Sequence, residues 1–517
     1  MLCTSPRAVL ILLLALSHSI EHTEAQFDGE CKFNKPLKPR PHSASVLDFG
    51  AVGDGETLNT LAFQNAIFYL KSFADKGGAQ LYVPAGRWLT GSIKLTSHLT
   101  LFLEKEAIIL GSKVSPWTGC DVPACLEFFL CVHGNIKAVT VFTIAEALVL
   151  GNETIIMRRS RVWPSCGCIK NHEISGSNPS GGRNLGGFFS SVQAMDYSHW
   201  DIIEALPSYG RGNNGTVDCQ GSIWWEQFSA HSLNYSRPYL VEFVSSKDVV
   251  VSNLTFLNAP AGNIHPVYCS NVVVQNISIH SPANSPYTYG VVPDSSEHVC
   301  IENSNISMGH DAVVLKSGWD EYGITYGKPT SNVHIRGVRL QSFAGAGMAF
   351  GSEMSGGISN VFVEHVYLHD SLFGIELKTA RGRGGYIKDI LVMDVVMANV
   401  QVGVEATGQC DSHPDEKFDP SALPVVSCIT FKDIVGTNVS IAGNFTGLSD
   451  SPFTSICLSN VTFFISSNPT PWLCSDVSGS SQNVSPEPCP ELQSSFSSTT
   501  TTCFSLLHHV YSQVAVS

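Results

Sequence analysis

One stretch of the chain, residues 285–323, gathers ionisable side chains at the ends of short apolar runs. Its segments VVP and DAVVLKS predict short strands, and the ionisable residues lie at or next to the turns between them. These residues are Asp294, His310, Asp311, Lys316 and Asp320. Carboxylates and an imidazole in such positions can transfer protons or bind a polar substrate. We interpret the stretch as one wall of an active site, with a solvent-facing turn residue as the alternative for any single carboxylate.

Residues 1–25 are typical of a secretory signal peptide. They combine a basic Arg7, an apolar run and a small residue at Ala25. No later segment has the roughly 18 uninterrupted apolar residues of a membrane span. Ten N-x-[ST] sequons also favour export. We therefore expect a secreted, extracellular protein without a membrane partner.

The chain carries a formal charge of −14 and 16 cysteines. The acidic charge argues against nucleic acid or an anionic membrane as a partner, although a local basic patch could still bind an anionic substrate. In an exported chain the cysteines predict disulfides, and removal of Cys3 with the signal peptide leaves an odd number, so at least one thiol should be unpaired. Cys166 and Cys168 do not have the spacing of a zinc site. The cysteines expected to form C-terminal disulfides are Cys457, Cys474, Cys489 and Cys503.

Two apolar patterns follow one another along the chain. Residues 57–74 have the spacing of an amphipathic helix, which we expect to cap one end of the fold. From Gln80 onward, short alternating runs between Gly, Asn or Pro turns predict strands. We predict one domain over residues 26–490 and a disordered Ser/Thr-rich tail over residues 491–517.

Seven of the predicted strands resemble one another, and their first apolar residues are 23, 27, 34, 28, 29 and 39 positions apart. These residues are Val249, Val272, Val299, Val333, Val361, Ile390 and Ile429. Such a repeat predicts a solenoid in which each turn stacks on the next. Short strands without intervening helices favour an all-β, right-handed parallel β-helix over a β-sandwich or a propeller.

Asparagines recur at the predicted corners of the repeat, where they tolerate left-handed turns and can stack along the axis. They are Asn253, Asn271, Asn276, Asn305, Asn332 and Asn360. Residues 113–195 lack the repeat and contain five cysteines. We interpret this segment as a long insert or as sequence that is not translated.

Seven motifs in order resemble the polygalacturonase-like glycoside hydrolases of the plant cell wall. They are DFGAVGDGETLNT, LPSYGRG, GSIWWEQF, VVPDSSEHV, LKSGWDEYG, AFGSEMSGG and IELKTARGRGGYIKDI. The resemblance implies a right-handed parallel β-helix that hydrolyses α-1,4-galacturonosyl links in pectin with inversion, without a metal or other cofactor. It also implies a pectic polysaccharide as partner (homogalacturonan or a modified form), a cell-wall location and a monomer.

The site motifs of that family are only partly kept. Its Asn-Thr-Asp motif matches Tyr287-Thr288-Tyr289, and its Gly-Asp-Asp motif matches Gly309-His310-Asp311. Its Gly-His-Gly motif matches Gly345-Ala346-Gly347, and its Arg-Ile-Lys motif matches Glu376-Leu377-Lys378. Of the residues that the family uses, only Asp311 and Lys378 keep their type.

An inverting glycosidase needs a carboxyl or similar acid and a base about 6.5–9.5 Å apart. His310 could be the acid and Asp311 the base, because a neighbouring carboxylate raises an imidazole pKa. A histidine that only hydrogen-bonds at a strand end is the alternative. Tyr289 could contact a sugar, and Glu376 would repel a galacturonate carboxylate, which favours a neutral or modified sugar there. Glu353, like Glu376, could be a substitute carboxylate.

Basic residues after the last motif predict an anion-binding lip, because Arg binds carboxylates in a bidentate way. They are Lys378, Arg381, Arg383 and Lys388. Two functions remain open at this point: a pectin hydrolase, or a catalytically weak or inactive β-helix that binds pectin. The binding groove of the second would contain Trp319, Tyr289, Lys378 and Arg381. A calcium-dependent lyase is less favoured, since the site has lost carboxylates.

Overall fold

The computed structural model describes residues 39–112, 215–233, 236–410, 412–466 and 471–494, and the backbone of four strands between residues 132 and 204. The predicted signal peptide lies outside the described residues. The same holds for most of the predicted insert and for all but the first four residues of the predicted tail.

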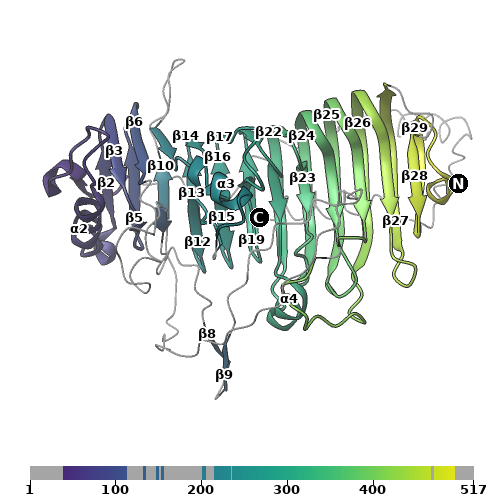
Figure 1. Ribbon diagram of the computed structural model, residues 1–517, viewed down its shortest axis with the longest axis horizontal. Coiled ribbons are helices and arrows are strands. Elements are labelled where there is room, and N and C mark those ends of the chain that lie inside the picture. Colours follow the sequence, from purple (N-terminus) through teal and green to yellow (C-terminus); the bar gives the residue numbers. More distant parts are fainter. Residues whose placement is uncertain are drawn as a thin grey trace, which may run out of the picture.

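The described chain winds into coils that lie side by side along one long axis (Figure 1). Its main sheet has 27 strands, and the strands of each coil pair in parallel with those of the next coil. Three stacks of strands result, with apolar side chains between them. The predicted all-β parallel β-helix is therefore the observed architecture.

Most strands belong to a single stack. Several of the strands from β22 onward are longer and bend through two or three stacks. The first contains β1 (His42–Ser45), β2 (Ala79–Val83), β5 (Leu99–Leu103), β10 (Asp201–Glu204), β13 (Lys247–Ser252), β16 (Ser270–Gln275) and β19 (Glu297–Glu302). The second contains β3 (Gly86–Thr90), β6 (Ala107–Gly111), β11 (Gly215–Asp218), β14 (Leu254–Leu257), β17 (Ser278–His280) and β20 (Asn305–Met308). The third contains β4 (Ile93–Lys94), β7 (Val132–Gly134), β12 (Val241–Val244), β15 (Gly262–Val267), β18 (Tyr289–Val291), β21 (Val313–Leu315), β23 (Ala346–Phe350) and β28 (Trp472–Ser475). The strands that join stacks are β22 (Thr330–Ser342), β24 (Ile358–Lys378), β25 (Tyr386–Thr407), β26 (Val425–Thr446), β27 (Phe453–Ile465) and β29 (Val477–Ser485).

The predicted repeat is the actual register of the first stack. Val249 pairs with Val272, and the pairing continues through each predicted position to Ile429. These side chains are at most 2% exposed. Rows of β-branched residues suit the pleated, buried surface of a parallel sheet, so the row stabilises each coil on its neighbour.

Five of the six predicted corner asparagines have left-handed backbone conformations, with φ between 52° and 56°. They are Asn253, Asn271, Asn276, Asn332 and Asn360. The prediction for Asn305 is wrong, because this residue lies in β20 and the left-handed corner is Asn303 two positions earlier. Side-chain ladders join such corners, as where the Asn271 amide donates to Asp248 over 2.8 Å.

The predicted capping helix is α2 (Thr60–Lys71), which packs at the end of the solenoid beside β1, β2 and β4 (Figure 1). It is shorter than predicted, because a separate 3₁₀ turn covers Ala74–Lys76. The other α-helices among the described residues are α3 (Ser222–Ser229) and α4 (Asp320–Tyr326), with further 3₁₀ turns at Val46–Phe49 and Pro490–Leu492. Within the described ranges, no helix has the length and apolarity to cross a membrane.

Part of the predicted insert contributes to the solenoid. Strand β7 lies in the third stack between β4 and β12, with which it pairs in parallel. The strands β8 (Ala147–Leu150) and β9 (Glu153–Ile156) instead form a separate antiparallel pair. Near the C-terminal end of the chain, Cys474 and Cys489 form a disulfide. Elsewhere in the chain, Cys269 and Cys428 are free thiols.

Candidate active site

The third stack carries the candidate site on the side that faces away from the solenoid interior. Side chains alternate between the two faces of a strand, and Val291 and Val313 fill the interior in register. The intervening positions face outward. One outward row runs in register from Glu376 to Glu405 and then to Asn444. Polar groups from successive coils therefore lie next to one another on this face.

Lys378 joins two carboxylates in a buried ion cluster. Its Nζ lies 2.8 Å from Asp311 Oδ2 and 3.1 Å from Glu376 Oε2, and all three side chains are 1% exposed. The backbone N–H of Ala346 donates to Asp311 Oδ1 over 2.9 Å. Glu376 Oε1 has no hydrogen-bond partner among the described residues. The positive charge of Lys378 is therefore paired with two carboxyl groups of the protein.

His310 lies beside this cluster. Its Nδ1 is 3.1 Å from Asp311 Oδ1, although the direction of the contact is not that of a hydrogen bond. The imidazole centroid is 5.1 Å from that of Tyr287 and 5.5 Å from that of Tyr289. Five of the six predicted site residues, all but Arg381, consequently lie in one group whose members come from three segments of the chain.

The surroundings of the two carboxyl groups in the cluster shift their pKa values in opposite directions. Burial opposes ionisation of Asp311, but Lys378 and His310 outweigh it and hold the Asp311 pKa well below its usual range. Burial dominates at Glu376 and raises its pKa, even though Lys378 favours the ionised form. Lys378 keeps a raised pKa because Asp311 and Glu376 outweigh its burial. Asp311 and Lys378 therefore stay charged over the whole physiological range.

Glu405 is a member of the outward row that was not predicted from the sequence. Its side chain accepts a hydrogen bond from Asn444 Nδ2 over 2.9 Å. Burial, followed by the charge of Glu376, raises its pKa to about 8. The Gly-[IV]-Glu pattern at residues 374–376 recurs at residues 403–405, and this repeat could have indicated Glu405 from the sequence. At neutral pH this carboxyl group is protonated and offers an O–H donor.

Replacing Glu405 by Gln is expected to flatten the dependence of stability on pH. The folded-state pKa of about 8 lies above the ordinary carboxyl value. Glu405 thus contributes stability that is complete below about pH 4 and is lost as the pH rises through 8. Gln keeps the acceptor for Asn444 but cannot ionise. Denaturant unfolding between pH 5 and 8.5 should show the wild type losing more stability than the variant.

The matched control for that experiment is Glu416→Gln, because Glu416 is exposed to solvent. Its stability should follow the wild type at every pH. Parallel curves for wild type and Glu405→Gln would contradict a buried, protonated carboxyl at this position.

The predicted basic lip does not form. Arg383 is fully buried, and its Nη1 lies 2.5 Å from Asp320 Oδ1. Lys388 is exposed beside Asp389 and over the Tyr386 ring. The prediction fails because each cation finds a protein carboxylate nearby, and burying Arg383 requires one.

Arg381 lies at the exposed edge of the same region, where its Nη2 pairs with Asp450. It can contact a substrate only by leaving that partner. The predicted pectin-binding groove also lacks Trp319, which is buried and lies 5.5 Å from the Arg383 guanidinium. Lys378 and Tyr289 are buried as well, so these side chains do not line one open groove.

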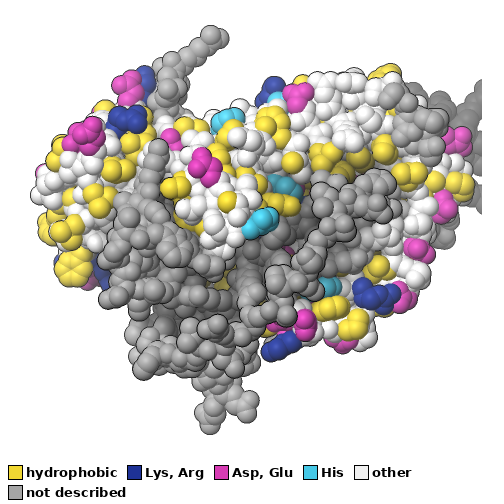
Figure 2. Space-filling model, in the orientation of Figure 1, with side chains coloured by type: hydrophobic (Ala, Val, Ile, Leu, Met, Phe, Trp, Pro, Cys, Tyr) yellow, Lys and Arg dark blue, Asp and Glu magenta, His cyan; other side chains and the backbone are white. Residues whose placement is uncertain are grey.

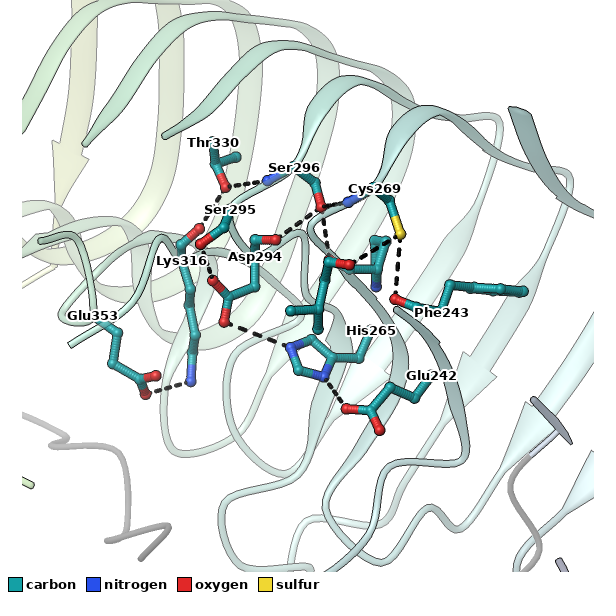
Figure 3. A network of polar contacts seen from close by, with 12 residues as sticks. Glu242, Phe243, His265, Cys269, Asp294, Ser295, Ser296, Lys316, Thr330 and Glu353 are labelled. Atoms are coloured by element: carbon teal, nitrogen blue, oxygen red, sulfur yellow. Dashed lines mark hydrogen bonds and ion pairs between the residues drawn. The ribbon is translucent and has the colours of Figure 1, made fainter. Parts of the chain in front are cut away.

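A second polar network lies on the same face, towards the N-terminal coils (Figure 3). His265 Nδ1 is 2.9 Å from Glu242 Oε1, and its Nε2 is 3.7 Å from Asp294 Oδ2. Lys316 Nζ donates to Glu353 Oε1 over 2.7 Å. Asp294 and Lys316 were predicted to lie at the site, and Glu353 was a candidate carboxylate. The sequence did not indicate His265 and Glu242, since both lie outside residues 285–323, where the ionisable residues cluster.

The two groups of residues are neighbours through Tyr289. Lys316 Nζ lies 5.1 Å from the centre of the Tyr289 ring, and that ring also contacts His310. Tyr239 stacks on His265 with a centroid distance of 4.0 Å. The face thus alternates aromatic rings and polar groups, an arrangement suited to sugar rings and their hydroxyl groups.

Metal-ligand geometry appears once within the described ranges, at Cys474, Cys489 and Glu491. The two cysteines form a disulfide, so they have no thiolate for a metal. This group lies near the C-terminal end and has no role in the candidate site.

Two family models match this chain, and the one described as "Rhamnogalacturonase A/epimerase, pectate lyase-like" covers residues 43–102. The family model described as "Glycosyl hydrolases family 28" matches residues 193–485. A "Probable polygalacturonase" of Vitis vinifera is 40% identical, and the alignment covers 93% of this chain and 87% of that protein. The chain belongs to glycosyl hydrolase family 28. An "Exo-poly-alpha-D-galacturonosidase" of Dickeya chrysanthemi matches this family 28 chain at 25% identity, over 78% of this chain and 64% of that protein.

Solved structures show the same fold. An exopolygalacturonase from Thermotoga maritima has a TM-score of 0.62 at 24% identity, covering 87% of this family 28 chain and 93% of its own. A polygalacturonase from Erwinia carotovora has a TM-score of 0.55 at 18% identity, covering 87% and 99% of the two chains. The predicted family and the predicted right-handed parallel β-helix are both confirmed.

Proposed function

We propose that this family 28 glycosidase is secreted and hydrolyses α-1,4-galacturonosyl links in pectin with inversion. Membership of a glycosyl hydrolase family supports the reaction class, and the Vitis vinifera relative named a probable polygalacturonase supports the substrate. The observation that carries the proposal is the group of His310, Asp311 and Lys378, in which Asp311 lies 3.1 Å from His310 and 2.8 Å from Lys378.

His310 is the proton donor in this proposal. Asp311 stays ionised and lies 3.1 Å from the imidazole. Protonation of the glycosidic oxygen by His310 allows the bond from the anomeric carbon to this oxygen to break. Tyr289 provides an aromatic contact beside the donor.

Asp311 orients the proton donor in this proposal. Its Oδ1 lies 3.1 Å from His310 Nδ1, closer than the roughly 6.5–9.5 Å between the acid and the base of an inverting glycosidase, so the predicted role of Asp311 as the base does not fit this geometry. Its two oxygens already face the Ala346 N–H, His310 and Lys378. Its low pKa also makes it a weak base, because proton affinity falls with pKa, so another carboxylate must receive the proton of the attacking water. Lys378 and Glu376 orient this carboxylate, and Arg381 is a peripheral substrate contact.

The extracellular environment of the proposal is supported by the sequence features of an exported chain and by the Cys474–Cys489 disulfide. The pectic polysaccharide is the partner, and the enzyme acts as a monomer without a cofactor. The sequons also fit this compartment, since N-glycosylation takes place on the secretory route.

Purified secreted protein is expected to release reducing ends from pectin between pH 4.5 and 7. The products should carry the inverted anomeric configuration, which NMR detects before mutarotation. The retained configuration would contradict the proposed mechanism. Binding to pectin without release of reducing ends at any pH would instead support the alternative, an inactive pectin-binding β-helix.

A further inference from the structure

Three cations in the described part of the third stack's outward face are paired with carboxylates of the protein, namely Lys316, Lys378 and His265. A fourth, Arg237, lies beside Tyr287 and donates instead to the backbone carbonyls of Pro260 and Pro286. The carboxyl groups on this face are Glu242, Asp294, Asp311, Glu353, Glu376 and Glu405. Carboxyl groups therefore outnumber cations among these residues. A surface that binds a polyanion has the opposite balance, with more cations than carboxylates.

Lys378 is the most enclosed of these cations. It contacts both Asp311 and Glu376, and all three side chains are 1% exposed. A substrate carboxylate at this position would have to displace one of them and leave a buried charge without its partner. That exchange is strongly unfavourable, because breaking a buried ion pair leaves a charge away from both water and its partner. Lys378 is therefore unsuited to binding a free galacturonate carboxylate.

Lys316 is held in a similar way. Its ammonium group donates to Glu353 over 2.7 Å and lies over the Tyr289 ring. Its side chain is 6% exposed, whereas that of Glu353 is 22% exposed. The more accessible member of the pair is thus the carboxylate, so an approaching anion meets negative charge first.

His265 completes the pattern between Glu242 and Asp294 (Figure 3). Burial disfavours its protonated form, but the two carboxylates outweigh burial and raise its pKa. Nε2 is buried without a hydrogen-bond partner among the described residues, because Asp294 is 3.7 Å away. With Tyr239 stacked on its ring, this histidine suits a sugar hydroxyl group or an ester carbonyl.

The space-filling view of Figure 2 shows how charged side chains are distributed over the described surface that faces the viewer. Among the coloured side chains in Figure 2, lysines and arginines lie singly or beside acidic groups and do not gather into one basic patch. Long-range attraction of a polyanion needs such a patch. The net charge of −14 adds to the repulsion.

We propose that this face binds galacturonosyl units whose carboxyl groups are esterified, so that the preferred substrate is methyl-esterified homogalacturonan. The inference rests on the proposed pectin hydrolase and specifies its substrate. A methyl ester removes the negative charge that Asp311 and Glu376 would repel. It keeps the ring hydroxyl groups and a carbonyl acceptor, to which the protonated Glu405 can donate its O–H group.

The test compares one homogalacturonan before and after saponification, so that both substrates share a backbone. The value of kcat/KM for wild-type protein should be at least about tenfold higher on the esterified polymer, a difference of about 1.4 kcal/mol. Equal rates, or a preference for the saponified polymer, would overturn the inference while leaving the hydrolase intact. If neither polymer is cleaved, the proposed function fails, and affinity electrophoresis on the same two polymers still decides the preference.

A variant pair links the preference to the cluster. Glu376→Gln removes one carboxylate and should narrow the ratio between the two polymers by about threefold or more, mainly through KM on the saponified polymer. Glu297→Gln is the control, because Glu297 is an exposed residue of β19 on the first stack. An unchanged ratio in a folded Glu376→Gln variant would assign the preference to other residues and contradict the argument from Lys378.

Discussion

Replacing Lys378 by Met should destabilise the protein by roughly 3–5 kcal/mol at neutral pH, the usual cost of removing one partner from a buried ion pair. The ammonium group lies within 3.1 Å of two carboxylates, and each of the three side chains is 1% exposed. Without it, Asp311 and Glu376 would be two buried carboxyl groups with no cation between them.

The loss should depend on pH in a definite direction. The wild-type Asp311 pKa is depressed, so its contribution is present above the ordinary carboxyl pKa and is lost as the pH falls. In the variant both carboxyl groups would have raised pKa values, and stability would be lost as the pH rises. The difference between wild type and variant should therefore shrink from pH 7 towards pH 4.5, as measured by denaturant unfolding.

Lys388→Met is the matched control, since Lys388 is 44% exposed and its nearest carboxylate is 3.9 Å away. We expect this change to alter the free energy of unfolding by less than about 1 kcal/mol. A Lys378→Met variant as stable as the control would show that the cluster is accessible to water.

Replacing His310 by Gln should lower kcat/KM on pectin by about 10²- to 10⁴-fold, the usual contribution of a positioned general acid. Gln fills most of the imidazole volume and retains polar atoms beside Asp311 but cannot donate a proton to a leaving group. The loss should lie in kcat, because a proton donor acts in the transition state. Reducing-end assays with a thermal unfolding curve for each variant make the measurement.

His280→Gln provides the comparison, since His280 is an exposed residue of β17 on the second stack. Its kinetics should match the wild type. Full activity in a folded His310→Gln variant would remove the histidine from catalysis and leave Glu405, protonated at neutral pH, as the next donor to test.

The sequence alone determined the architecture of the first stack. Alternating apolar residues and corner asparagines are local signals, and a solenoid contacts mainly its neighbouring coils. The positions from Val249 to Ile429 could therefore be aligned without a structure, and each pair proved to be in register. Asn305 shows the limit of this approach, because a turn can shift by two residues without changing the apolar pattern.

Only the tertiary structure decided the chemistry of the third stack. Motifs brought Asp311 and Lys378 to attention separately, but their 2.8 Å contact joins residues 67 positions apart. Arg383 was predicted to bind a substrate, yet it pairs with Asp320 in the interior, 63 positions away. Burial also raises the pKa of Glu405 to about 8. The ion-pair partner and the burial of a side chain depend on which coils lie next to each other. Because the loops between strands vary in length, the sequence alone does not specify which side chains of neighbouring coils meet.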